Sequence, residues 1–342
     1  MTSLHFIPPT NPSVDDCWRG VVLYGKNTAS YKFALATALL ELRPESGQLL
    51  KLEDLAPVFA GHIARHLVES PKQITATNGR FLRACLEFNQ EHNLSKLVDA
   101  TVANGFNNVI DAFHMVSSTP VAHRFYIDER KENRGIRITD EFSKLMDGIY
   151  TDNLSQEVDA RWRLVETAWN LGLSANLLSV QHDVDLEKMF VHDRNLKRRG
   201  VTSSRAALSG YQKGKCFYCA TPLSLVAGSS NTDVDHFFPH ALKQRRLGIN
   251  FDGVWNLVLS CALCNRGKDG KFDRIPSTKL LGRLFGRNEY FIDSHHPLRE
   301  TLINQTGSTV TVRQAFLADV YQKVQLNPAQ AWDPPNEHDW VS

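Results

Sequence analysis

The stretch that decides the fold of this chain runs from Cys216-Phe-Tyr-Cys219 to Cys261-Ala-Leu-Cys264, and it continues into Asn265-Arg266-Gly267-Lys268. Each cysteine pair has a two-residue gap, which lets both sulfurs face one ion from a tight turn. Two such pairs predict a tetrahedral zinc site whose ligands are the thiolates of Cys216, Cys219, Cys261 and Cys264. A zinc ion with four cysteine ligands has no open position, so we expect its role to be structural.

The composition of the chain restricts where it works. Of its 342 residues 42% are hydrophobic and 22% are charged, which is typical of a soluble globular protein. The longest apolar stretch, residues 33–42, is too short to cross a membrane and predicts a core helix. The first residues, MTSLHFIPPTNP, lack a basic start and an apolar segment, so we expect no signal peptide and a cytoplasmic protein. In that reducing compartment the isolated Cys17 and Cys85 predict small core residues and not a disulfide framework.

The segment between the two cysteine pairs is unusually long for a simple zinc module. It has 41 residues between Cys219 and Cys261, far more than a compact zinc finger spans. It contains Val234-Asp235-His236-Phe237-Phe238-Pro239 and then Trp255-Asn256-Leu257. We therefore expect a further structure to be built inside this segment.

The order of these motifs is similar to that of a known enzyme family. Read as C-x-x-C, D-H-x-x-P, N and C-x-x-C-N-x-x-K, residues 216–268 resemble the HNH (His-Me finger, ββα-metal) endonucleases. The closest form of that pattern is the one with four zinc-binding cysteines, found in phage resolvases and some restriction enzymes. One position departs from the motif, because Asn265 stands where its third letter is histidine. Asparagine still offers an oxygen ligand to a hard cation.

The resemblance implies a role for each residue of the motif. His236 is expected to be the general base, since an unperturbed histidine titrates near physiological pH. Asp235 and Asn265 are expected to hold a catalytic Mg²⁺ or Mn²⁺. Asn256 is expected to brace the loop that carries His236 and not to bind metal. His240, one turn after His236, has no place in the pattern, and we expect it to be structural.

The charge is distributed unevenly along the chain. Although the net charge is only +2, residues 194–290 hold 17 Lys and Arg against 6 Asp and Glu. Such a block predicts a polyanionic partner, although a solvated basic face would have the same composition. We expect the phosphate contacts to come from this block, including Arg245, Arg246, Arg266 and Lys268, with DNA as the partner and RNA not excluded.

The rest of the chain predicts an α+β protein with a mostly helical first domain. Apolar residues repeat with helical period over 51–69, where Pro57 indicates that the helix proper begins there, and over 156–173. Residues 124–128 and 136–139 alternate as strands do and predict a hairpin. Residues 174–200 lose apolar periodicity, so we place the boundary between domains 1–195 and 196–342 there. Val312, Phe316, Val320 and Val324 predict a C-terminal helix.

Together these features predict a metal-dependent HNH endonuclease that nicks or cuts DNA, as in bacterial restriction or anti-phage defence. The domain 1–195 carries no recognisable chemistry, and we expect it to recognise a protein partner, a DNA feature or a signal. Two other hypotheses remain. The chain could be a non-catalytic zinc DNA-binding module in which Asp235 and His236 are incidental, or a nuclease or toxin that acts on RNA.

Overall fold

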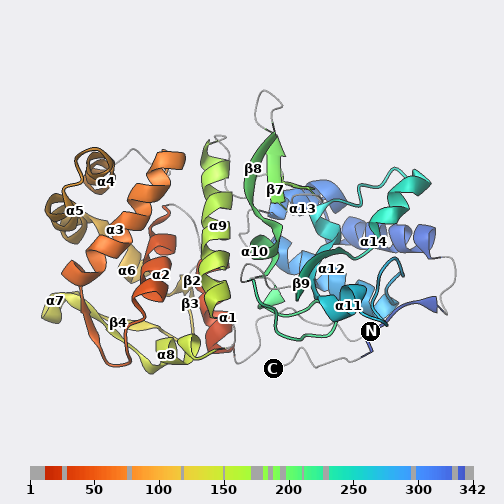
Figure 1. The fold of residues 1–342 in the computed structure, drawn as a ribbon, viewed down its shortest axis with the longest axis horizontal. Helices are drawn as coiled ribbons and strands as arrows, with labels where there is room; N and C mark the ends of the chain where they lie inside the picture. The colour runs from red at the N-terminus through yellow and green to blue at the C-terminus, as the bar shows by residue number, and fades with distance from the viewer. Residues whose placement is uncertain are drawn as a thin grey trace. The chain divides into compact units, whose positions relative to one another are not determined.

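A computed structural model describes residues 12–24, 29–74, 79–116, 119–148, 151–170, 180–183, 188–192, 198–209, 212–225, 231–293, 298–325 and 330–335. These residues fall into two compact units, an N-terminal unit within Thr10–Ala175 and a C-terminal unit within Asn176–Ser342 (Figure 1). Both units consist mainly of helices with small antiparallel sheets, which confirms the predicted α+β class. The boundary predicted at residue 195 lies outside the described residues.

The N-terminal unit combines helices with two small sheets. Its helices are α1 (Val14–Arg19), α2 (Tyr31–Leu42), α3 (Leu52–Glu69), α4 (Arg80–Glu91), α5 (Leu94–Ala100), α6 (Val109–Ala112), α7 (Arg130–Asn133), α8 (Asp140–Met146) and α9 (Asp152–Asn170). Its strands are β1 (Leu49–Lys51), β2 (Met115–Val116), β3 (Thr119–Pro120), β4 (Tyr126–Glu129) and β5 (Gly135–Ile138). One sheet has the order β1-β5-β4, and β2 pairs with β3. The predicted hairpin is therefore confirmed, with the short helix α7 as its connection.

The prediction that the helix proper begins at Pro57 is wrong. Helix α3 begins at Leu52 and contains Pro57 in its second turn. Proline lacks the N–H that would donate to the carbonyl of the fourth residue before it, so proline at this position destabilises a helix. Leu52 and Leu55 are both buried, and the apolar surface that they remove from water stabilises the first turn.

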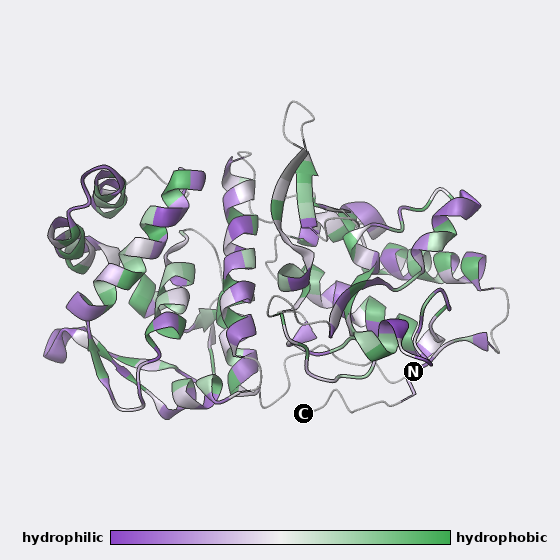
Figure 2. Cartoon of the chain, viewed as in Figure 1, coloured by the Kyte–Doolittle hydropathy of each residue, from purple (hydrophilic) through white to green (hydrophobic). Residues whose placement is uncertain are grey.

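The long helix α9 lies in the core of the N-terminal unit. Helical period is predicted over 156–173, and the apolar residues that follow it, Val158, Trp162, Val165 and Trp169, are all buried. Figure 2 shows hydrophobic and hydrophilic residues alternating along this helix. The ring of Trp162 stacks on His66 with 3.6 Å between the ring centroids. Cys17 and Cys85 are buried in the same unit, as predicted.

The C-terminal unit contains a three-stranded sheet, a two-stranded sheet and several helices. Its strands are β6 (Gln181–Asp183), β7 (Lys188–His192), β8 (Arg198–Ser203), β9 (Thr232–His236) and β10 (Leu257–Cys261). Its helices are α10 (Ser204–Ser209), α11 (Ala262–Arg266), α12 (Thr278–Asp293), α13 (Arg299–Thr306) and α14 (Val310–Val324), with short 3-10 helices η5 (His240–Arg245) and η6 (Val254–Asn256). The sheet β6-β7-β8 occupies part of the region in which apolar periodicity is lost.

The C-terminal helix is confirmed, but its buried face differs from the prediction. Val320 and Val324 of α14 are buried, whereas Val312 is 50% exposed and Arg313 is buried in its place. The guanidinium of Arg313 reaches Glu289 of α12 through two hydrogen bonds of 2.7 and 2.6 Å, which pairs the charge that burial would otherwise penalise. Within the described residues, no helix is both long enough and apolar enough to span a lipid bilayer.

Candidate functional site

The four cysteines of the two pairs form one buried cluster in the C-terminal unit. Their sulfur atoms all lie within 4.8 Å of one another, and the Cys219 and Cys261 sulfurs are 3.8 Å apart. Zinc–thiolate bonds of about 2.3 Å in tetrahedral geometry place sulfurs about 3.8 Å from each other. The cluster therefore fits a structural zinc ion in spacing, burial and ligand type.

The backbone around the cluster holds the sulfurs in place. Cys261 is the last residue of β10 and the N-cap of α11, and its sulfur accepts a hydrogen bond from the Cys264 N–H at 3.4 Å. The Cys261 N–H donates in turn to the sulfur of Cys216 at 3.3 Å. Arg283 of α12 donates to the carbonyls of Phe217 and Tyr218 at 2.8 Å each. The first cysteine turn is thus fixed by a buried guanidinium as well as by the cluster itself.

Strands β9 and β10 and helix α11 bring the polar residues of the motif next to this cluster. The strands are antiparallel, with His236 opposite Leu257 and Thr232 opposite Cys261. Asp235 and His236 are the last two residues of β9, and neighbouring side chains on a strand point to opposite faces. Helix α11 follows β10 directly and carries Asn265.

Asp235 is buried and contacts two side chains that the motif does not include. Its carboxylate accepts a hydrogen bond of 2.6 Å from the hydroxyl of Tyr218 and lies 3.3 Å from the ammonium of Lys271, which is itself fully buried. Burial raises the pKa of Asp235, and the charge of Lys271 and the bond from Tyr218 oppose that rise. Tyr218 lies between Cys216 and Cys219, so its hydrogen bond connects Asp235 directly to the first cysteine turn.

Asn265 contacts an acidic residue that the sequence analysis missed. Its amide donates a hydrogen bond of 3.1 Å to Asp233, which also pairs with Arg266 at 2.9 Å. Asp233 precedes Asp235 by two residues, so both carboxylates belong to the same face of β9. That alternation is the sequence signal by which Asp233 could have been found.

His236 faces a second cluster, centred on Asp252. The distance from His236 Nε2 to Asp252 Oδ1 is 3.1 Å, and His240 Nε2 lies 3.4 Å from the same oxygen. Lys243 contacts the other carboxylate oxygen. Burial alone would raise the pKa of Asp252, but hydrogen bonds from His236 and Lys243 lower it to about 2. Asp252 belongs to no part of the motif, and only the fold of the intervening loop brings it to His236.

Asn256 is fully buried and makes three hydrogen bonds to the backbone on both sides of this cluster. Its oxygen accepts from the Phe238 N–H at 2.8 Å, and its amide donates to the carbonyls of Phe238 and Phe251 at 2.9 and 2.8 Å. The side chain therefore ties the segment after His236 to the segment before Asp252.

The predicted phosphate-binding residues lie at the surface, but part of the basic block does not. Arg245, Arg246, Arg266 and Lys268 are exposed. Lys271, Arg283 and Arg287 are buried, so the expectation that the block as a whole supplies phosphate contacts is wrong for them.

Arg287 of α12 supports the start of β10. Its guanidinium donates to the carbonyls of Leu257 and Trp255 and to the side chain of Asn288. Burial lowers the pKa of Arg287 to about 9, which still leaves it charged at neutral pH. Its hydrogen bonds with backbone carbonyls replace those that water would make.

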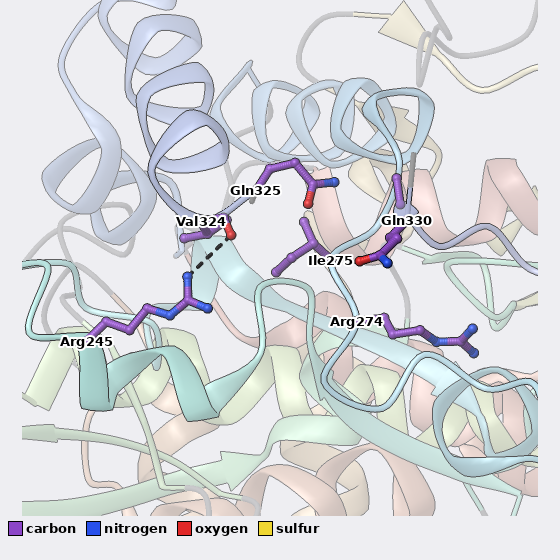
Figure 3. Close-up of a pocket in the computed structure, with 7 residues that line it drawn as sticks. Arg245, Arg274, Ile275, Val324, Gln325 and Gln330 are labelled. Atoms are coloured by element: carbon purple, nitrogen blue, oxygen red, sulfur yellow. Dashed lines mark hydrogen bonds between the residues drawn. The ribbon is translucent and has the colours of Figure 1, made fainter. Parts of the chain in front are cut away.

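Arg245 lines a pocket of about 570 Å³ together with Arg274, Ile275, Val324, Gln325, Gln330 and Ala331. Figure 3 shows the guanidinium of Arg245 turned toward Val324, whose carbonyl accepts a hydrogen bond from it at 3.4 Å. The side chain of Arg274 points away from Val324 and Arg245. Arg274 donates to the carbonyl of Asp269 at 2.7 Å, in the loop after α11. None of Asp235, His236 and Asn265 lines this pocket.

Models of known protein families, curated proteins and solved structures were compared with the chain, and none matches it.

Proposed function

We propose that this chain is a metal-dependent endonuclease of the HNH kind that hydrolyses phosphodiester bonds in DNA. The observation that supports this best is that one compact ββα unit, made of β9, β10 and α11, carries Asp235, His236 and Asn265 beside the cysteine cluster. The resemblance of residues 216–268 to that family supplies the order of the motif, and the contacts of the unit supply a physical role for each residue.

His236 is the general base of the proposed reaction. Its side chain is largely buried beside Asp252, and an imidazole can accept the proton of an attacking water near neutral pH. Asn256 does not touch the reacting atoms; it is a positioning residue, because its hydrogen bonds fix the backbone that follows His236.

The residues on the other face of β9 are of the types that bind a hard divalent cation. Asp235 and Asp233 provide carboxylates, and Asn265 provides an amide oxygen, which are the ligands that Mg²⁺ prefers. Tyr218 and Lys271 take two of the roughly four lone-pair positions of the Asp235 carboxylate, so the group retains capacity for a further ligand. Asp235, Asp233 and Asn265 would hold Mg²⁺ or Mn²⁺, which would supply positive charge to stabilise the phosphate during hydrolysis.

The cysteine cluster has a structural role in this proposal. Zinc held by four thiolates has no position for water or substrate, so it fixes the ends of β10 and α11 without taking part in chemistry. Exposed Arg245, Arg246, Arg266 and Lys268 supply sequence-independent contacts with phosphates.

The test is cleavage of supercoiled plasmid in Mg²⁺ by the full chain and by His236→Ala. The matched control is His92→Asn, which removes an exposed imidazole from the N-terminal unit, where asparagine tolerates the left-handed backbone (φ 55°). The proposal expects nicked or linear product from the wild type and the control, and a loss on the order of a hundredfold or more in His236→Ala. Equal cleavage by all three proteins would refute it, and cleavage of RNA but not plasmid would assign RNA as the substrate.

A further inference from the structure

Asp252 is held in a fixed position relative to His236 by the turn that precedes η6. Its own N–H donates to the side chain of Asn250 at 3.1 Å, and the Gly253 N–H donates to the Asn250 carbonyl at 3.2 Å. The amide of Asn256 holds the neighbouring Phe251 carbonyl and, at the same time, the backbone of Phe238. One buried asparagine therefore sets the distance between the segment that carries His236 and the segment that carries Asp252.

The carboxylate of Asp252 has a defined orientation as well as a defined position. Lys243 binds one oxygen, and the other lies 3.1 Å from Nε2 of His236. The side chains of Asp252 and His236 are only 22% and 9% exposed, so water competes weakly for this contact. An ionised carboxylate can only accept hydrogen bonds, so the nitrogen of His236 that faces it must carry the proton.

We propose that Asp252 is a positioning residue that holds His236 as the Nε2–H tautomer, with the lone pair on Nδ1. The inference rests on the proposed function, in which that lone pair takes a proton from the attacking water. As the proton moves to Nδ1, the water oxygen forms a bond to phosphorus, and the bond from phosphorus to the leaving sugar oxygen breaks. The leaving oxygen then takes a proton from solvent, so Asp252 stays ionised throughout and contributes orientation alone.

His240 and Lys243 have different parts in this arrangement. Lys243 keeps the far oxygen of Asp252 occupied, which prevents the carboxylate from rotating away from His236. His240 is 48% exposed, and its nitrogen is farther from Asp252 than that of His236 is. Removing His240 should therefore affect cleavage much less than removing Asp252.

The inference is tested with Asp252→Asn in the full chain. The matched control is Asp273→Asn, which removes an exposed carboxylate from the same unit. Asp252→Asn should lower kcat on the order of a hundredfold, with KM and zinc content unchanged, whereas Asp273→Asn should stay near wild type. An Asp252→Asn variant that keeps the wild-type kcat, in a protein whose activity depends on His236, would overturn the inference.

A second measurement does not depend on catalysis. Nitrogen-15 NMR of histidine-labelled protein distinguishes the two imidazole tautomers, and His236→Ala assigns the signal. The Nε2–H tautomer is expected in the wild type and a mixture in Asp252→Asn; the Nδ1–H tautomer in the wild type would overturn the inference. If the wild type does not cleave nucleic acid, the proposed function fails, and the NMR result still decides whether Asp252 orients His236.

Discussion

Replacing Arg287 by methionine separates two interpretations of the basic block. The first interpretation, from charge counting alone, places Arg287 on a phosphate-binding surface. The second, from the structure, is that Arg287 is fully buried and donates hydrogen bonds to the backbone carbonyls of Trp255 and Leu257 at the start of β10. Methionine keeps most of the aliphatic stem and removes the guanidinium. The substitution should therefore destabilise the C-terminal unit and leave the number of phosphate contacts unchanged.

The magnitude follows from the groups that lose their partner. The carbonyl of Leu257 and the side-chain oxygen of Asn288 lose bonds from Arg287, and each unsatisfied buried acceptor costs about 1–3 kcal/mol. The carbonyl of Trp255 keeps a bond of 3.1 Å from Asn288, so its loss is smaller, about 1 kcal/mol. Together these give a fall of about 3–7 kcal/mol in the free energy of unfolding. The observed fall should be smaller than this sum, because the variant no longer has a buried charge to desolvate.

The assay is urea denaturation followed by tryptophan fluorescence, since Trp255 is buried beside the lost bonds. The control is Lys268→Ala, an exposed residue that should leave stability unchanged and weaken DNA binding. An Arg287→Met variant of wild-type stability whose binding has a shallower salt dependence would show that Arg287 contacts phosphate, and the structural interpretation would be wrong.

Three further predictions concern the zinc, the salt dependence and the pH dependence. Cys219→Ser should lose zinc and local structure together, because zinc binding energy in such modules is largely folding energy, whereas Cys85→Ala should keep one zinc per chain in elemental analysis. Neutralising Arg245, Arg246 and Lys268 together should flatten the salt dependence of DNA binding more than neutralising Lys51, Lys72 and Arg80, which are exposed in the N-terminal unit; equal effects would contradict the charge asymmetry. Burial lowers the pKa of His114 to about 3, and the Nε2 of this side chain accepts a hydrogen bond from the Phe125 N–H. Below about pH 6.5, the histidine therefore binds a proton in the unfolded chain but stays neutral in the folded protein. The contribution of His114 to the free energy of unfolding should be complete above that pH and about 2 kcal/mol smaller at pH 5. Urea denaturation should show this loss in the wild type and not in His114→Phe.

Features that depend on local spacing could be predicted from the sequence, and features that depend on loop conformation could not. The cysteine pairs and the stripe of α9 are set by two-residue gaps and helical period, and both are found where expected. The sequence misplaces the start of α3, because it shows the helix-breaking tendency of Pro57 but not the burial of Leu52. Charge counting could not separate Arg287 from Lys268, because composition carries no information on burial.

The two acidic residues that contact the proposed site, Asp252 and Asp233, differ in whether the sequence could have predicted them. Asp252 lies 16 residues after His236, and no periodicity relates the two positions; only the turn around Asn250 and the hydrogen bonds of Asn256 bring them together. Asp233, by contrast, shares the alternation of β9 with Asp235 and was within reach of sequence reasoning.

The position of the cysteines explains how a zinc ion without chemical activity would control the proposed reaction nearby. Tyr218 lies inside the first pair and donates to Asp235 at 2.6 Å. Cys261 ends β10, whose pairing fixes β9, and Cys264 immediately precedes Asn265 in α11. Each segment of the proposed active site is thus attached to a sulfur of the cluster, either within the same turn or through one strand pair. Because side chains must be held within fractions of an ångström for hydrolysis, loosening the cluster should displace Asp235 and Asn265 relative to each other. Loss of zinc is therefore expected to abolish cleavage even though His236, on the opposite face of β9, keeps its contacts with Asp252.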